Sequence, residues 1–356
     1  MSLSALILRR LSNQRLLDAK FERPEEVVRW MGAIQAQDYA QAVWAIGLRT
    51  AAATLADVEQ AIAAKKIVRT WPLRGTIHFV PPEDVRWILQ LTAERVLNGA
   101  HRRQAQLGLD QAVLERSRQL FYDALRGGRS LNRPEMMDLL EQAGISTEKQ
   151  RGYHILAYAA LTGLICIGPM RKKQQTFVLL DEWAPHPRTL SKEAALAELA
   201  RRYFSSHGPA TLEDFARWVG ITLTDARSGL AGADLTAEMI AGVKYWLGAD
   251  PAPLPENLPQ DFQLLPGFDE YLIGYADRGA VLPGEHVGKV VPGGNGIFQP
   301  VIVSAGQVVG TWKRAIRKDT VEITLLPFTR LSVPRETVLA AVERYGRFLG
   351  LRVSLA

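Results

Sequence analysis

The chain has 356 residues, of which 47% are hydrophobic and 22% are charged, and it carries a net charge of +6. Its length predicts two or three compact units, and its single cysteine excludes an intramolecular disulfide and a cysteine-rich zinc site. No apolar run reaches the roughly 18–20 residues of a membrane span, and the N-terminal segment lacks the pattern of a secretory signal. We therefore expect a cytoplasmic protein with a mild preference for anions.

Residues 1–85 are predicted to form a first winged-helix unit. Apolar residues at helical spacing indicate helices at about 4–17, 24–31 and 55–64. Two strand-like segments follow, at 67–71 and 76–80, with Arg74 in the turn between them. Helices closed by a two-stranded ribbon are typical of a winged helix.

Residues 86–185 repeat this order as a second unit. Helical segments are predicted at 82–106, 109–125, 132–143 and 149–161. Ser146 or Thr147 is expected to cap the last of them. Two strand-like segments, at 164–167 and 176–180, then enclose a basic tip formed by Arg171, Lys172 and Lys173. A helix-turn-helix followed by a wing has this order.

Residues 190–250 contain a third copy. After a helix at 191–205, Thr211 and Asp214 form a capping box, and Thr222 caps a further short helix. A plain three-helix bundle with the same caps is the alternative. Three imperfect copies of one supersecondary unit favour the winged helix.

A proline-rich linker, Pro251–Pro259, separates these units from a β-rich unit at 260–356. Strands are predicted at 262–265, 301–303, 308–312 and 321–326, and a helix at 335–349. The predicted fold class is α+β, with tandem winged helix-turn-helix domains and a C-terminal β-rich, barrel-like domain.

The residue types limit the chemistry. No two of the six histidines stand at the spacing of a zinc-binding helix, and dinucleotide, P-loop and serine-nucleophile motifs are missing. We expect no metal and no cofactor. Cys166 lies in an apolar strand and is interpreted as a small core residue. Asp269 and Glu270 either form a catalytic acid pair or bind neighbouring arginines.

A Gln-Ala-Gln string, Gln35–Gln37, interrupts an apolar helix end. In an extended segment its two glutamines point to one side. The same string recurs at Gln104–Gln106 on a charged helix, so the string by itself indicates no function.

The surrounding sequence is more specific. The segments "MGAIQAQDYAQAVWAIGLR", "IVRTWPLRGTIHFVPPEDVRW", "LLPGFDEYLIGYADR" and "GGNGIFQPVIVSAGQVVGTWKR" occur in this order. Together they resemble the AlkZ/YcaQ family of winged-helix DNA glycosylases, over nearly the whole chain. The resemblance implies a monofunctional glycosylase that removes N7-alkylated purines from double-stranded DNA. It also implies bulky adducts and interstrand crosslinks as further substrates.

The resemblance also implies roles for individual residues. Gln35 and Gln37 match the catalytic positions of a Gln-apolar-Gln motif, with Ala36 in the apolar slot. Independently of the resemblance, the residue types and positions make Asp38, His78 and Asp269 candidates for supporting roles. The expected DNA contacts are Arg69, Arg74, Arg171, Lys172, Lys173, Lys313 and Arg314. We expect a monomer associated with the nucleoid.

Two other functions compete with this interpretation. A non-catalytic winged-helix regulator would have the same fold, but the predicted recognition helices at 149–161 and 225–230 carry few base-reading side chains. A small-molecule hydrolase would use Asp269 and Glu270.

Overall fold

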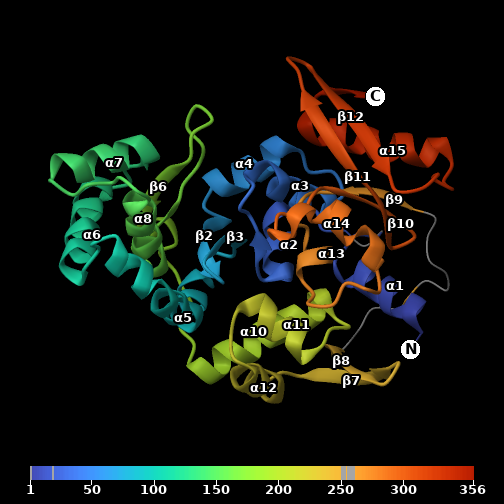
Figure 1. The fold of residues 1–356 in the computed structure, drawn as a ribbon, viewed down its shortest axis with the longest axis horizontal. Coiled ribbons are helices and arrows are strands. Elements are labelled where there is room, and N and C mark those ends of the chain that lie inside the picture. The colour runs from blue at the N-terminus through green and yellow to red at the C-terminus, as the bar shows by residue number, and fades with distance from the viewer. Residues whose placement is uncertain (1, 18–19, 250–253, 255–260) are drawn as a thin grey trace.

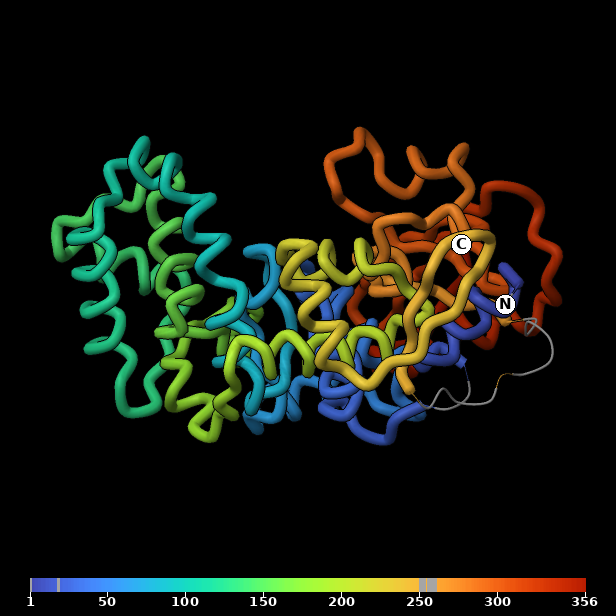
Figure 2. Tube along the Cα trace, turned by 90° about the horizontal axis from the view of Figure 1, so that it is seen from below, coloured from blue at the N-terminus to red at the C-terminus, as the bar shows by residue number. Residues whose placement is uncertain are grey.

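The computed structural model describes residues 2–17, 20–249, 254 and 261–356. Figure 1 shows an elongated molecule with a helical lobe at one end and a β-rich part at the other. Both chain ends lie toward the β-rich end (Figure 2). Apart from Leu254, the predicted linker Pro251–Pro259 lies outside the described residues. Within those residues, no helix is long and apolar enough to cross a membrane.

The described residues of the N-terminal part form four helices and three strands. These are α1 (Leu3–Asn13), α2 (Pro24–Met31), β1 (Ile34–Gln35), α3 (Tyr39–Arg49), α4 (Leu55–Ala63), β2 (Val68–Leu73) and β3 (Thr76–Val80). Thr54 caps α4 in a reciprocal capping box with Asp57. Helix α3 was not predicted. Its residues from Ala42 to Arg49 are all buried, so it lacks the amphipathic period that marks a surface helix.

The second part forms the helical lobe. It contains α5 (Val85–Gln106), α6 (Gln111–Leu125), β4 (Leu131–Asn132), α7 (Arg133–Gln142), α8 (Arg151–Leu161), β5 (Ile165–Ile167), β6 (Thr176–Leu179) and α9 (Leu180–Trp183). The predicted cap of α8 was wrong. The Thr147 hydroxyl donates to Glu141, and the residue before the helix is Gln150, in a left-handed conformation with φ 74°.

The strands of these two parts form one sheet, in the order β1-β3-β2-β5-β6-β4. Arg69 in β2 pairs with Ile167 in β5 and joins the two predicted ribbons. The boundary predicted near residue 85 therefore does not separate two sheets.

The third part packs beneath this sheet. It consists of α10 (Lys192–His207), α11 (Leu212–Val219), α12 (Leu223–Gly232), β7 (Leu235–Ile240) and β8 (Val243–Gly248). The Thr211–Asp214 capping box and the Thr222 cap form as predicted. Helix α10 contacts α1, α2 and α5, which places the third part against the N-terminal part.

The C-terminal part is a five-stranded sheet with one long helix. Its elements are β9 (Phe262–Leu265), α13 (Glu270–Ile273), η1 (Gly284–His286), α14 (Val287–Val290), η2 (Pro292–Gly294), β10 (Val301–Ser304), β11 (Gln307–Ile316), β12 (Thr320–Pro327), α15 (Arg335–Leu349) and β13 (Arg352–Leu355). The strand order is β13-β12-β11-β10-β9. Trp44 of α3 packs on Tyr345 and Phe348 of α15 and donates from Nε1 to the Leu264 carbonyl at 2.7 Å. This contact fixes the C-terminal part on the N-terminal one.

Candidate active site

The Gln-Ala-Gln string lies on the short strand β1 and in the turn that follows it. Gln35 pairs with His78 of β3, and the Ala36 amide donates to the Ile77 carbonyl at 2.7 Å. Ala36 is buried, whereas Gln35 is half-buried and Gln37 is exposed. The two glutamines therefore alternate with a core residue, as an extended segment requires.

Arg69 holds the middle of the string in place. Its Nε and Nη2 donate to the Ala36 carbonyl at 3.2 and 2.8 Å, and its Nη1 donates to Gln175 at 3.3 Å. The guanidinium also lies over the Tyr39 ring, and burial lowers the pKa of Arg69 to about 10. Arg69 is only 5% exposed. Contrary to the prediction, Arg69 is therefore not available to contact a phosphate, because its donors are bound inside the protein.

The side chain of each glutamine has a neighbour that orients it. The Ile77 amide donates to Gln37 Oε1 at 3.1 Å, which leaves the second lone pair of that oxygen available. Gln35 Oε1 lies 3.5 Å from Arg74 Nη2. Both amide oxygens therefore have a defined direction.

Arg74 faces the motif from the β2–β3 turn. It adopts a left-handed backbone with φ 55°. A Cβ at Gly220 would lie 2.9 Å from Arg74 Cγ, so the glycine at the end of α11 leaves room for the arginine stem. Arg74 Nη1 is buried and has no hydrogen-bond partner among the described residues. Burial lowers the pKa of Arg74, an effect that Glu270 opposes.

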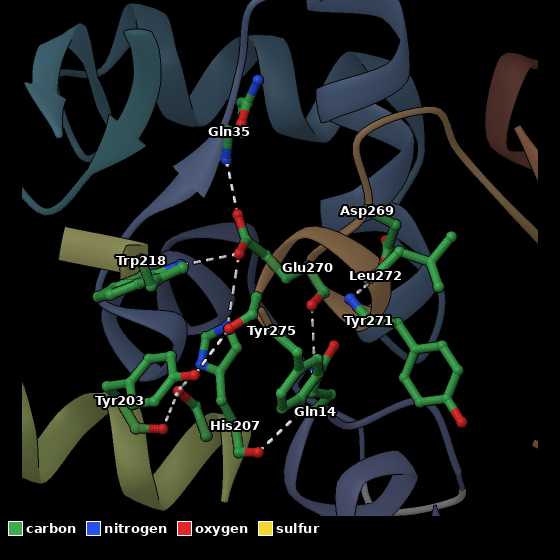
Figure 3. A network of polar contacts seen from close by, with 12 residues as sticks. Gln14, Gln35, Tyr203, His207, Trp218, Asp269, Glu270, Tyr271, Leu272 and Tyr275 are labelled. Carbon is green, nitrogen blue, oxygen red and sulfur yellow. Dashed lines mark hydrogen bonds and ion pairs between the residues drawn. The ribbon is translucent and has the colours of Figure 1, made fainter. Parts of the chain in front are cut away.

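Glu270 lies below Gln35 and is fully buried (Figure 3). Its Oε1 accepts from the Gln35 backbone amide at 2.9 Å, and its Oε2 accepts from Trp218 Nε1 at 2.9 Å. His207 Nε2 lies 3.4 Å from Oε2. Burial disfavours the charged carboxylate, but His207 and the Gln35 amide outweigh it and bring the pKa of Glu270 to about 2. Glu270 is therefore ionised at neutral pH.

His78 is also buried, with 0% exposure. Its Nδ1 lies 2.9 Å from the Thr76 carbonyl, to which a protonated Nδ1 donates. Burial, followed by the positive charge of Arg74, lowers the pKa of His78 to about 3. The ring is neutral at neutral pH and cannot act as a general acid there.

The two candidate aspartates have structural partners. Asp38 is exposed and caps α3, since its Oδ1 accepts from the amides of Ala40 and Gln41. Asp269 is buried and bound to Arg49 by two contacts of 2.9 Å. Asp269 and Glu270 are thus both buried, and both carboxylates are bound by other groups of the protein. This contradicts the hypothesis of a hydrolase that uses them as an acid pair.

The remaining basic candidates lie on two hairpins. Lys172 and Lys173 form the exposed tip between β5 and β6, and the neighbouring Arg171 is exposed but binds Glu135. Lys313 on β11 is exposed, whereas Arg314 lies over the Tyr345 ring and donates to its hydroxyl. Burial lowers the pKa of Arg314, and Asp38 opposes that effect.

Sequence reasoning missed the residues beneath the motif. Glu270, Trp218 and His207 come from α13, α11 and α10, and 235 positions separate Glu270 from Gln35. Glu270 was predicted only as half of an acid pair with Asp269 or as a partner of neighbouring arginines. Nothing in the local sequence could pair it with Gln35.

Two large cavities lie away from the motif. One of about 760 Å³ lies among α5, α6 and α8, and one of about 700 Å³ lies between α2 and α10. Neither is lined by Gln35 or Gln37. Among the described residues, no group of three or more histidine, cysteine or acidic side chains is arranged to hold a metal ion.

The mixed α+β fold is that of a DNA glycosylase family. A family model described as "DNA glycosylase AlkZ-like" matches residues 28–348, and the chain belongs to this family. It is therefore an enzyme of DNA repair rather than a non-catalytic regulator.

Both comparisons with individual proteins lead to Streptomyces sahachiroi. The chain is 28% identical over 308 residues to an interstrand DNA cross-link repair glycosylase, with 81% of each chain covered. The solved structure of the DNA glycosylase AlkZ superposes with a TM-score of 0.81 at 24% identity, with 100% of both chains covered. At this identity the superposition establishes the fold.

Proposed function

We propose that this glycosylase hydrolyses the N-glycosidic bond of N7-alkylated purines in double-stranded DNA, including bulky adducts and interstrand crosslinks. The crosslink-repair relative supports the larger substrates. The single observation that carries the proposal is that the Gln35–Gln37 backbone is held in place. Glu270 binds it at Gln35, and Arg69 and Ile77 bind it at Ala36, while Gln37 remains exposed.

Two neutral amides suit this reaction. An N7-alkylated purine already carries a positive charge, so it can leave without protonation by a general acid. The sugar then passes through an oxocarbenium-like transition state. We assign to Gln35 and Gln37 the tasks of positioning a water molecule and stabilising the cationic sugar through their carbonyl oxygens. Because glutamine is a poor base, the rate gain comes from orientation and electrostatics.

DNA binding is assigned to the units around the motif. We propose that residues 1–85, 86–185 and 190–250 are winged helices, and that the unit at 260–356 completes the DNA-binding surface of a monomer. Lys172, Lys173 and Lys313 are exposed and are the proposed phosphate contacts. The unpartnered Nη1 of Arg74 can bind only a group that reaches the motif, and we assign it to a phosphate of the damaged nucleotide.

The test is release of 7-methylguanine from alkylated duplex DNA. Gln37→Ala is expected to abolish release and to keep DNA affinity within about 3-fold, because Gln37 lies at the reacting bond and not at the phosphates. Gln106→Ala is the matched control, since Gln106 ends the second Gln-Ala-Gln string, on α5. Release that persists in Gln37→Ala contradicts the catalytic assignment.

A crosslinked duplex tests the larger substrates separately. Conversion of a purine–purine N7 crosslink into two separate strands by the wild-type protein, and not by Gln37→Ala, supports the wider range. If only 7-methylguanine is released, the enzyme is restricted to small lesions.

A further inference from the structure

The strand that carries Gln35 is short and has one partner. β1 contains two residues and pairs only with β3 among the described strands. The Gln35 amide is not part of that ladder and points to the other side, where a free strand edge would be open to water. It donates instead to Glu270 Oε1 at 2.9 Å. The Glu270 carboxylate thus accepts the hydrogen bond that a second neighbouring strand would otherwise accept from Gln35.

Glu270 is itself held by residues of the third part. Trp218 Nε1 donates to its Oε2, and His207 Nε2 lies 3.4 Å from the same oxygen. The Ser206 hydroxyl donates to the Arg202 carbonyl at 2.7 Å and lies 2.8 Å from His207 Nδ1. These contacts hold the imidazole ring beside Glu270. The carboxylate therefore has donors on both oxygens and little rotational freedom.

The helix that begins at Glu270 is fixed as well. Asp269 caps it and is bound to Arg49, and the Tyr203 hydroxyl donates to the Gly274 carbonyl at 2.7 Å. These contacts come from Arg49 of α3 and Tyr203 of α10. Glu270 is therefore held in a fixed position, and its hydrogen bond to the Gln35 amide restricts the motion of Gln35.

We propose that Glu270 is a positioning residue for base excision, which holds Gln35 in its reactive orientation through the backbone amide. The inference rests on the catalytic role proposed for Gln35. Glu270 does not touch the substrate. Its negative charge also offsets the positive charge of Arg74 beside Gln35, which would otherwise disfavour a cationic sugar.

The experiment is single-turnover excision with Glu270→Gln at saturating enzyme, with DNA affinity measured in parallel. Glutamine has one oxygen for two N–H donors, so Gln35 or Trp218 loses its acceptor. We expect the rate constant to fall about 10- to 100-fold, with the Kd for DNA within about 3-fold.

A second substitution separates positioning from simple support. In Glu270→Gln/Trp218→Phe the competing donor is gone, so the glutamine oxygen can accept from Gln35. We expect the double variant to be faster than Glu270→Gln alone. A purely structural role makes the double variant slower and overturns the proposal. If Glu270→Gln does not fold, Glu270→Asp replaces it, because its shorter side chain cannot reach both donors; a wild-type rate in Glu270→Asp overturns the proposal.

The same assay separates the two levels of inference. Wild-type protein that releases no alkylated purine overturns the proposed function and this inference with it. Activity that is lost in Gln35→Ala but unchanged in Glu270→Gln overturns the positioning role alone.

Discussion

Arg49 and Asp269 are 220 positions apart and form a two-point ion pair, with both N–O distances 2.9 Å. Their side chains are 1% and 0% exposed. Arg49 also donates to the Ala45 carbonyl and to Gln14, and Asp269 accepts from the Tyr271 amide. The pair therefore ties α1 and α3 to α13 and supports the site from below.

Asp269→Asn is expected to lower the free energy of unfolding by about 3–5 kcal/mol, because it leaves the Arg49 charge buried without its partner. Chemical denaturation measures this. Excision per folded molecule should fall far less than in Gln37→Ala. If Asp269→Asn abolished excision at unchanged stability, Asp269 would be a catalytic residue after all.

Arg69→Lys tests the support of the motif from the opposite side. Lysine keeps the charge but cannot reproduce the fork that binds Ala36 and Gln175 together. We expect the single-turnover excision rate to fall about 10-fold, with the salt dependence of DNA binding unchanged. A wild-type rate combined with weaker salt dependence would make Arg69 a phosphate contact.

Lys172→Ala and Lys173→Ala test the hairpin tip. Each is expected to reduce the slope of log affinity against log salt by about 0.9, because each lysine neutralises one phosphate. Arg171→Ala serves as the matched comparison. Its effect should be smaller, since Arg171 is already bound to Glu135. Fluorescence anisotropy over a salt series measures the slopes, and equal slopes in all three variants and the wild type would remove the tip from the DNA contacts.

His78 makes stability depend on pH. Its folded pKa, about 3, is below the ordinary 6.5, so the unfolded chain binds a proton first as the pH falls. The stability that neutral His78 contributes is complete above 6.5 and is lost as the pH falls through about 3. Between pH 6.5 and about pH 5, the wild type should lose about 2 kcal/mol more than His78→Gln.

Thermal or urea unfolding at several pH values measures this difference. His101→Gln is the matched control, because His101 is exposed. If the wild type and His78→Gln have the same pH dependence, the buried ring is not neutral in the folded protein.

Local signals predicted much of the secondary structure. Thr54, Thr211 and Thr222 cap their helices as expected, because a capping side chain binds an amide within three residues. The hairpin of β7 and β8 was missed. Its strands carry many exposed and partly exposed residues, so they lack a clear alternation of apolar and polar positions.

The environments of the basic residues could not be predicted from the local sequence. Arg69, Arg74 and Lys172 were all expected to bind phosphate. In the structure Arg69 binds a backbone carbonyl, Arg74 faces the motif and Lys172 is exposed. Charge can be read from the sequence, but whether a charge is solvated depends on which distant elements cover it.

The family resemblance, the helix caps and the Gln35–Gln37 motif can be recognised in the sequence, since each depends on residue types at short spacing. The contact of Glu270 with Gln35, the neutral state of His78 and the ion pair of Asp269 with Arg49 follow from the folded structure alone. These three features depend on burial. Removal from water changes the protonation and the partners of a side chain, and burial is produced by packing between segments that are distant in the chain.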